Sequence, residues 1–308
     1  MDRIGCVSGA ACVETVGIIR ELLRYGARVT VVANRAALEL VGEKSLEFAC
    51  GKPIIKEITG QVEHVIAGHE ADLLMITPCC ATSLGKMVNG IGDNPPMLVA
   101  LTCIGAKTPM IVAPAMDKNM SDSDIVQKNM KSVKKFANVI EPVMIEGKAK
   151  LPSKERLVAE ACKMAGPKSL DRKKVLIMGG GSSEPIDDVR VVSNRSSGRM
   201  AISLAESAFA MGADVDLWLG NASYEYGNWI KTTRFEALSK LRSLVKGMKR
   251  YDAVVVPAAL SDFIPERAKG KLDSAKPITL KMKKAPKIIN DIRKKHKGLL
   301  YVFKLGAR

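Results

Sequence analysis

Small and polar residues stand at several points where an apolar run gives way to a helical pattern, and their types suit the binding of anions. The first is Val7-Ser8-Gly9-Ala10-Ala11, where small side chains would let backbone N–H groups approach a phosphate at a helix N-terminus. The second is Gly179-Gly180-Gly181, which offers the same freedom after a later apolar run. Tight packing of a strand–helix turn is the competing explanation for both, and the glycine run matches neither the dinucleotide fingerprint nor a P-loop.

Further candidates adjoin other elements. Pro78-Cys79-Cys80-Ala81-Thr82-Ser83 and Ala113-Pro114-Ala115-Met116-Asp117 each follow a buried-strand pattern, at the end of a strand where doubly wound folds bind ligands. His64 stands at the start of a helix that leads into a buried strand; a lone histidine is more often structural, and His69 in the same helix competes with it. The pair Ser196-Ser197 precedes another helix and suits its N-cap.

The elements that must position these residues alternate between strand and helix in both halves of the chain. The apolar strands do not alternate in polarity, which is typical of a parallel sheet covered by helices on both faces. We therefore predict two tandem doubly wound, Rossmann-like α/β domains. The expected strands are 29–32, 72–76, 109–113, 174–178, 214–219, 253–256, 278–282 and 299–303, and the expected helices are 14–24, 61–69, 82–89, 122–135, 155–165 and 198–211.

The division between the two domains is expected in residues 146–172, which are rich in Lys, Gly, Pro and Ser. We place the domains at 1–165 and 166–308. The chain stops directly after the last expected strand, whereas a parallel strand normally leads into a covering helix. We therefore expect the second domain to be cut short.

Composition supports a globular protein: 308 residues favour about two domains, and 47% of them are hydrophobic. No apolar run approaches the roughly 20 residues that cross a bilayer, and the start has no signal-peptide plan. Seven cysteines at irregular spacings resemble no disulfide framework or zinc site, so we expect a reducing, cytoplasmic location.

The formal charge of +16 lies almost entirely in the second half, with 20 basic against 18 acidic residues up to residue 165 and 28 against 14 after it. A solvated basic face explains most of it, and a site for an anionic small molecule comes next. Few aromatic residues are interleaved and no nucleic-acid motif is present, so we expect no nucleic-acid partner.

The motifs of the first half, taken in order, resemble the flavin-binding cysteine decarboxylases. Val-Ser-Gly is followed by Val62-Glu63-His64-Val65, by Ala71-Asp72 with Thr77-Pro78, by Asn89-Gly90-Ile91-Gly92-Asp93-Asn94, and by Pro-Ala-Met. The resemblance is closest to the decarboxylase half of the bifunctional phosphopantothenoylcysteine decarboxylase/phosphopantothenate–cysteine ligases of coenzyme A synthesis. It implies a flavodoxin-like fold, His64 as an active-site residue, and substrate contacts from Met116 and Asp117. It implies FMN contacts from Ser8, Gly9, Ala10, Asn34, Cys79, Thr82 and Ser83.

The first half also departs from that family. The turn after Gly9 is one residue short, and Thr82 and Asp117 stand where the family has Asn. Bacterial members carry a cysteine in a mobile clamp, whereas residues 144–150 contain none. An alternative therefore stays open, in which the first half binds flavin without decarboxylating and serves as an assembly scaffold for the second.

The second half resembles the ligase half of the same family. The strings that carry the resemblance are Glu184-Pro185-Ile186-Asp187-Asp188-Val189-Arg190, Asn194 to Met200, Pro257 to Phe263, Gly270 to Ser274 and Ala285 to Ile289. They imply condensation of 4′-phosphopantothenate with cysteine through an acyl-nucleotidylate, driven by CTP or ATP with Mg²⁺.

Particular residues take roles by this resemblance. Lys271 would neutralise charge on the α-phosphate, Asn194 would hold the reacting carboxyl group, and Asp262 would contact the nucleotide or its Mg²⁺. The remaining nucleotide contacts would be Gly179, Gly180, Gly181, Ala258, Pro286, Lys287, Ile288 and Phe303, and the substrate contacts Arg190, Ser196, Ser197 and Gly198. The family also implies a homo-oligomer, with trimers of the decarboxylase half and dimers of the ligase half.

Overall fold

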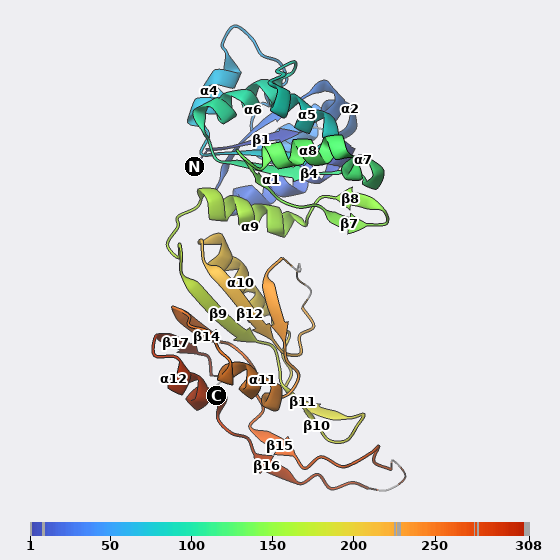
Figure 1. Cartoon of the computed structure of the whole chain (residues 1–308), viewed down its shortest axis with the longest axis vertical. Coiled ribbons are helices and arrows are strands. Elements are labelled where there is room, and N and C mark those ends of the chain that lie inside the picture. The colour runs from blue at the N-terminus through green and yellow to red at the C-terminus, as the bar shows by residue number, and fades with distance from the viewer. Residues whose placement is uncertain are drawn as a thin grey trace. The chain divides into compact units, whose positions relative to one another are not determined.

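The computed structural model describes residues 2–7, 10–224, 226, 229–273, 275 and 277–304. The chain divides into two units, residues 1–167 and 168–308 (Figure 1). Within the described residues, no helix is both long enough and apolar enough to cross a membrane.

The first unit is built on a five-stranded parallel sheet with the order β2-β1-β3-β4-β6. This is the flavodoxin-like order, in which the chain reverses direction across the sheet between β1 and β3. The strands are β1 (Asp2–Val7), β2 (Arg28–Ala33), β3 (Leu73–Cys79), β4 (Met110–Pro114) and β6 (Asn138–Val139). Every residue of β3 and β4 is buried, which explains why their sequences show no alternation of polarity.

Helices cover this sheet. They are η1 (Ala10–Glu14), α1 (Thr15–Arg24), α2 (Arg35–Val41), α3 (Glu43–Cys50), α4 (Glu63–Glu70), α5 (Ala81–Asn89), α6 (Pro95–Ala106), α7 (Lys118–Asp122), α8 (Asp124–Val133) and α9 (Lys154–Ala165). Gly68 lets α4 lie close to α6, because a Cβ there would stand 2.4 Å from Thr102 Cγ2. A small antiparallel sheet, β5 (Met116–Asp117), β8 (Lys148–Lys150) and β7 (Val143–Ile145), follows the carboxyl end of β4.

The second unit repeats the plan with a parallel sheet of order β13-β12-β9-β14-β17. The chain starts in the central strand β9 (Lys174–Gly179) and moves outward first to β12 (Asp214–Leu219) and β13 (Lys231–Arg234). It then returns to the other side as β14 (Ala253–Val256) and β17 (Leu299–Val302). The reversal falls between β9 and β14, so ligand-binding residues are expected at the carboxyl ends of these strands.

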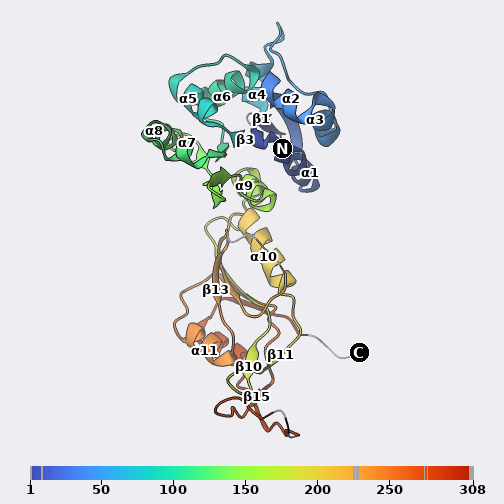
Figure 2. The same ribbon diagram turned by 90° about the vertical axis from the view of Figure 1, so that its right-hand side faces the viewer.

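The side chains of alternate residues of β9 are buried on opposite faces of this sheet. Val175 and Ile177 pack with α10 (Arg199–Ala210), whereas Leu176 and Met178 pack with α11 (Leu238–Lys246) and α12 (Ile288–Lys295). Figure 2 shows α10 and α11 on opposite sides of the sheet. Each fully buried aliphatic side chain contributes roughly 1.5–3 kcal/mol, so both faces fix the strand in its register.

Two hairpins extend from the second unit. One pairs β10 (Ser183–Pro185) with β11 (Val191–Ser193), and the other pairs β15 (Phe263–Pro265) with β16 (Met282–Lys284), both antiparallel. We call residues 263–284 the arm.

The two doubly wound sheets are confirmed, but the prediction of a parallel strand at 278–282 is wrong. Ile278, Leu280 and Met282 alternate with polar residues and are all more than 40% exposed. Such alternation is typical of a strand with one face in water, and the strand that forms, β16, lies in the arm outside the parallel sheet.

Candidate functional site

Several predicted flavin contacts lie at the carboxyl ends of strands in the first unit. Asn34 follows β2 and caps α2, where its Oδ1 accepts a hydrogen bond from Ala37 N at 2.9 Å. Cys79 ends β3 and is fully buried, and burial raises the pKa of its thiol well above the ordinary value. On α5, Thr82 is exposed and Ser83 is buried. Ser8 and Gly9 lie outside the described residues, and Ala10 begins η1. Flavin contact by these residues remains a prediction.

A cavity of about 550 Å³ lies beside Met116 and Asp117, next to the segment that follows Gly9. Its apolar lining includes Val13, Ile18 and Leu151, and its charged lining combines Glu14 and Asp117 with Lys148, Lys150 and Lys154. The cavity therefore combines a wall suited to a flat apolar group with cations suited to a phosphate or carboxylate.

Asp117 has a structural role that the sequence did not suggest. Its carboxylate caps the short helix α7 by accepting a hydrogen bond from Asn119 N at 2.9 Å. Asn caps helices as well as Asp does, so the replacement of the family's Asn keeps the local backbone. Lys148 is the register partner of Asp117 in the β5–β8 pair, which places a cation on the strand facing the extra charge.

His64 lies at the start of α4, as expected, and is partly buried. Its Nδ1 is buried without a hydrogen-bond partner among the described residues. Thr77, Arg156 and Trp229 share this feature, so the role of His64 in the reaction stays a prediction. His64 does not line the cavity beside Asp117. The competing histidine, His69, is exposed.

In the second unit, the glycine run brings the ends of three strands together. A Cβ on Gly179 would stand 1.9 Å from Ala201 Cβ, so this glycine lets α10 lie against β9. Gly180 has φ +74°, a conformation that favours glycine. The N–H of Gly181 donates to Asn221 O at 2.8 Å and is not free for a phosphate. The described contacts thus favour the packing explanation, while nucleotide contact stays a prediction.

Asn194 lies where these strand ends meet. Its Nδ2 donates to Ala259 O at 3.1 Å, and its own carbonyl would be 2.8 Å from a Cβ on Gly181. Ala259 in turn donates to Gly180 O at 2.9 Å. A cavity of about 580 Å³ opens here, lined by Ser193, Asn194, Arg195, Ser196, Ser197, Asn221 and Ser223.

The two serines before α10 line this cavity and also hold the backbone. Ser196 Oγ accepts from Gly198 N and Ser197 Oγ from Arg199 N, both at 3.3 Å. The N-cap itself is Gly198, with φ +73°. The expectation that a serine caps α10 is therefore wrong, because a left-handed glycine occupies the cap position.

The other predicted nucleotide contacts have different surroundings. Asp262 Oδ1 accepts from Lys287 Nζ at 2.5 Å, and this hydrogen bond lowers the pKa of the Asp262 carboxyl. Phe303 N donates to Val256 O at 3.2 Å, at the end of β14. Ala258 precedes Ala259, whereas Pro286 lines a separate cavity of about 370 Å³ and Ile288 is a core residue.

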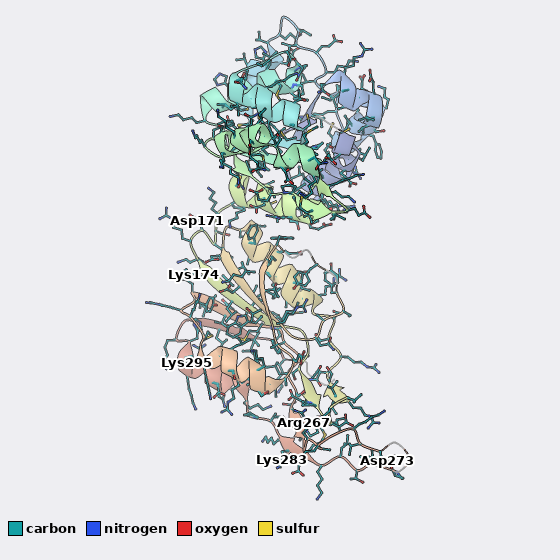
Figure 3. The ribbon with its side chains drawn as sticks, turned by 45° about the vertical axis from the view of Figure 1, so that its right-hand side comes forward. Asp171, Lys174, Arg267, Asp273, Lys283 and Lys295 are labelled. Atoms are coloured by element: carbon teal, nitrogen blue, oxygen red, sulfur yellow. The ribbon has the colours of Figure 1, made fainter. Side chains whose placement is uncertain are left out.

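Lys271 and Arg190 are not among the residues that line the Asn194 cavity. Lys271 is exposed on the arm, two residues before Asp273, which lies far along the arm in Figure 3. Arg190 Nη1 donates to Asp187 Oδ2 at 2.9 Å and to Leu272 O at 3.1 Å. The described contacts thus join Arg190 to the arm beside Lys271.

Sequence reasoning missed residues in both units. In the first, the lysines of the cavity gave no distinctive signal, because they lie in residues 146–172, whose Lys, Gly, Pro and Ser content predicted a division between domains. In the second, Ser182 Oγ lies 2.8 Å from Ser261 Oγ and accepts from Ser261 N at 2.9 Å, which ties β9 to the segment after β14. Asp187 stood in a quoted motif without a role, and nothing in the string distinguished it from the neighbouring Asp188.

Comparisons with known proteins show which families and proteins the chain is similar to. The Flavoprotein family matches residues 4–166, and the DNA/pantothenate metabolism flavoprotein C-terminal domain matches residues 170–306. The Coenzyme A biosynthesis bifunctional protein CoaBC of Thermococcus kodakarensis is 40% identical over 301 residues, covering 95% of this chain and 74% of that protein. Its namesake from Methanocaldococcus jannaschii is 34% identical over 303 residues, with 97% and 74% covered. The solved structure of the FMN-dependent cysteine decarboxylase SpaF matches with a TM-score of 0.48 at 21% identity, covering 53% of this chain and 96% of that one.

The fold and the two family matches together define the class of the protein. It is an α/β enzyme that joins a flavoprotein unit to a unit of pantothenate metabolism. The chain belongs to the family of bifunctional coenzyme A biosynthesis proteins, which confirms the resemblance found in its motifs.

Proposed function

We propose that the chain performs two steps of coenzyme A biosynthesis. The second unit condenses 4′-phosphopantothenate with cysteine, and the first decarboxylates the product, phosphopantothenoylcysteine, to 4′-phosphopantetheine. The observation that carries the ligase half is the cavity at the strand ends, which Asn194, Ser196 and Ser197 line with neutral polar groups beside the cationic Arg195. The neutral groups suit a reacting carboxylate, and the guanidinium of Arg195 suits the phosphate of an anionic substrate.

Two reactions in sequence would take place in the ligase unit. The carboxylate of phosphopantothenate attacks the α-phosphorus of CTP or ATP and releases pyrophosphate. The amine of cysteine then attacks the acyl carbon and releases the nucleoside monophosphate. Negative charge builds on the α-phosphate in the first step, where an ammonium group such as that of Lys271 would stabilise it.

Asp262 is the candidate for contact with Mg²⁺. Among the described residues no three His, Cys, Asp or Glu side chains gather to hold a metal. Mg²⁺ commonly binds through one or two carboxylates together with substrate phosphates and water, which suits a lone Asp262. Lys287 must then release the carboxylate, so the ion pair between them would exchange for the metal.

The residues that line the cavity beside Met116 and Asp117 have a chemical character that suits a flavin. They provide an apolar wall for the ring system, and Lys148, Lys150 and Lys154 for anionic groups. FMN, when bound, would supply the two-electron oxidation that lets the carboxylate leave and, afterwards, the two-electron reduction of the product. The chain itself would orient the substrate carboxylate through these lysines. His64, which does not line this cavity, is the candidate for proton handling, because its buried Nδ1 has no partner within the described residues.

One observation favours a second candidate, a first unit that binds flavin without decarboxylating. The β7–β8 hairpin, residues 143–150, borders the cavity and has no cysteine to supply a proton. A scaffold role of this unit for the ligase would then remain. We also propose a cytoplasmic homo-oligomer. The free thiols of the six cysteines whose side chains the structure describes suit a reducing compartment. Light scattering tests the assembly.

The decisive experiment joins a visible spectrum of the purified full chain to two assays. One follows CO₂ from phosphopantothenoylcysteine, and the other follows pyrophosphate from CTP or ATP with phosphopantothenate. Yellow protein that releases CO₂ supports the decarboxylase. Yellow protein without CO₂ supports the scaffold, and protein that stays colourless with added FMN refutes the flavin proposal. If pyrophosphate is released with neither CTP nor ATP, the ligase proposal is refuted.

A further inference from the structure

A buried carboxylate joins the β10–β11 turn to the part of the arm that carries Lys271. Asp187 lies in that turn, and its side chain is 0% exposed. Its Oδ1 accepts from Val189 N at 2.8 Å and Arg190 N at 2.6 Å, within the turn. Its Oδ2 accepts from Leu272 N at 3.0 Å, across 85 residues of sequence.

Arg190 completes the connection. Its Nη1 bridges Asp187 Oδ2 and Leu272 O, at 2.9 Å and 3.1 Å. Both peptide groups of Leu272 are therefore held, the N–H by the carboxylate and the C=O by the guanidinium. Farther back along the arm, Ala268 N donates to Ile186 O at 2.9 Å. The turn thus holds the arm on both sides of Lys271.

Lys271 needs such an anchor. Its side chain is exposed, and Gly270 before it has φ +70°, a left-handed turn that other residues rarely adopt. Within the part of the chain that the structure describes, the neighbouring strands of the arm, β15 and β16, pair with each other and not with the parallel sheet, so that sheet does not fix this segment. Charge-assisted hydrogen bonds to a buried carboxylate are stronger than neutral ones and are costly to leave half made.

We propose that Asp187 is a positioning residue of the ligase, which with Arg190 holds Leu272 so that the ammonium group of Lys271 is presented to the triphosphate. This inference rests on the proposed ligase function. It assigns Arg190 to the arm rather than to direct contact with substrate, and it explains why an acidic residue occurs in a site for anions: all of its lone pairs face donors of the protein.

The chain provides a matched control in the next residue. Asp188 Oδ1 accepts from Arg267 Nη2 at 2.8 Å, which also joins the turn to the arm. Both side chains of this pair are more than half exposed, at 54% and 59%. Exposed pairs of this kind contribute little, so loss of the Asp188 carboxylate should leave the arm in place.

The test compares Asp187→Asn with Asp188→Asn in the full chain. In Asp187→Asn the amide NH₂ meets the N–H of Leu272 or the guanidinium of Arg190, so donors face donors. We expect single-turnover formation of the acyl-nucleotidylate to fall about 10- to 100-fold, the range that charged hydrogen bonds contribute. Hydrogen exchange of the peptide covering 268–273 should accelerate about tenfold or more, while peptides of β9 exchange as in the parent. Asp188→Asn should change neither quantity.

A double variant distinguishes a positioning role of Asp187 from general destabilisation of the fold. Introduced into Lys271→Gln, the Asp187→Asn change should cost no further activity, because the group it positions is already gone. Arg190→Lys, which keeps the cation but loses the planar bridge, should give a smaller fall of about 2- to 10-fold and is the substitute if Asp187→Asn does not fold.

The outcomes are distinct. Parent-like turnover in Asp187→Asn, or a loss that persists in full on the Lys271→Gln background, would overturn the positioning role while leaving the ligase intact. A parent chain that releases no pyrophosphate from CTP or ATP would overturn the proposed function, and the inference with it.

Discussion

Substitution of Gly181 by Ala should damage the ligase site without removing any group that could take part in the chemistry. The added Cβ would stand 2.8 Å from the carbonyl oxygen of Asn194. Gly181 cannot move away, since it exchanges two hydrogen bonds of 2.8 Å with Asn221. The carbonyl must therefore retreat, and the segment of Asn194 moves with it.

The size of the effect follows from the distance. Ordinary contact of a Cβ begins at 3.4 Å, so the carbonyl must shift by about 0.6 Å. Overpacking of this kind costs about 1–3 kcal/mol of folding free energy, or roughly 3–12 °C in Tm for a unit of this size. Misplacement of about 1 Å at a reacting group costs ~100-fold in rate, so a fall of about 10- to 100-fold is expected.

The assay is single-turnover formation of the acyl-nucleotidylate, combined with thermal unfolding. Gly247→Ala is the matched control in the same unit, because its nearest contact is Leu244 O at 3.8 Å. It should leave both the rate and the Tm close to those of the parent. A Gly181→Ala chain that forms the intermediate at the parental rate would show that the position of Asn194 does not matter to the reaction.

Three further predictions concern other parts of the molecule. The hydrogen bond from Leu272 N–H lowers the pKa of the Asp187 carboxyl group to about 2. The ionised carboxylate therefore stabilises the fold above about pH 4, and this stabilisation is lost as the pH falls through about 2. The difference in urea midpoint between the parent and Asp187→Asn should shrink across that pH range. His64→Gln should retain flavin absorbance but release CO₂ much more slowly, which a rate equal to the parent's would contradict. Gly17→Ala, in α1 with nothing within 4 Å of the new Cβ, should raise the stability of the first unit by about 0.5–1 kcal/mol in thermal unfolding, and a lower Tm would show a hidden contact.

The buried strands could be predicted because their sequences are dominated by the requirement to be covered on both faces. Asp214–Leu219 and Ala253–Val256 were located to the residue for this reason. The strand Lys231–Arg234 was missed, because at the edge of the sheet its polar sequence is half solvated and carries no apolar run. The same argument, applied to the alternation in 278–282, would have placed that segment in a solvated hairpin.

The site was predictable only in part, since motifs give residue types but not their partners. Gly181 was expected after a strand, whereas Asn194 was expected only before a helix, and its place beside the strand ends is a finding of the structure. The carboxylate of Asp187 finds its partner 85 residues away at Leu272, and no local pattern encodes a contact over that separation. The hydrogen bond between Asp262 and Lys287 is likewise a tertiary contact between two residues that had been assigned separate roles.

The glycine run shows why the functional and the structural explanations of a motif need not compete. Gly179 lets α10 approach β9, and Gly181 lets the segment of Asn194 approach the strand ends. Neither glycine needs to touch a nucleotide for the site to depend on it, because a Cβ on Gly179 would push α10 away from β9 and a Cβ on Gly181 would push the carbonyl group of Asn194 out of place. The reason that glycine is required here is therefore the close approach of one protein segment to another, and the expected consequence of filling that space is a misplaced Asn194.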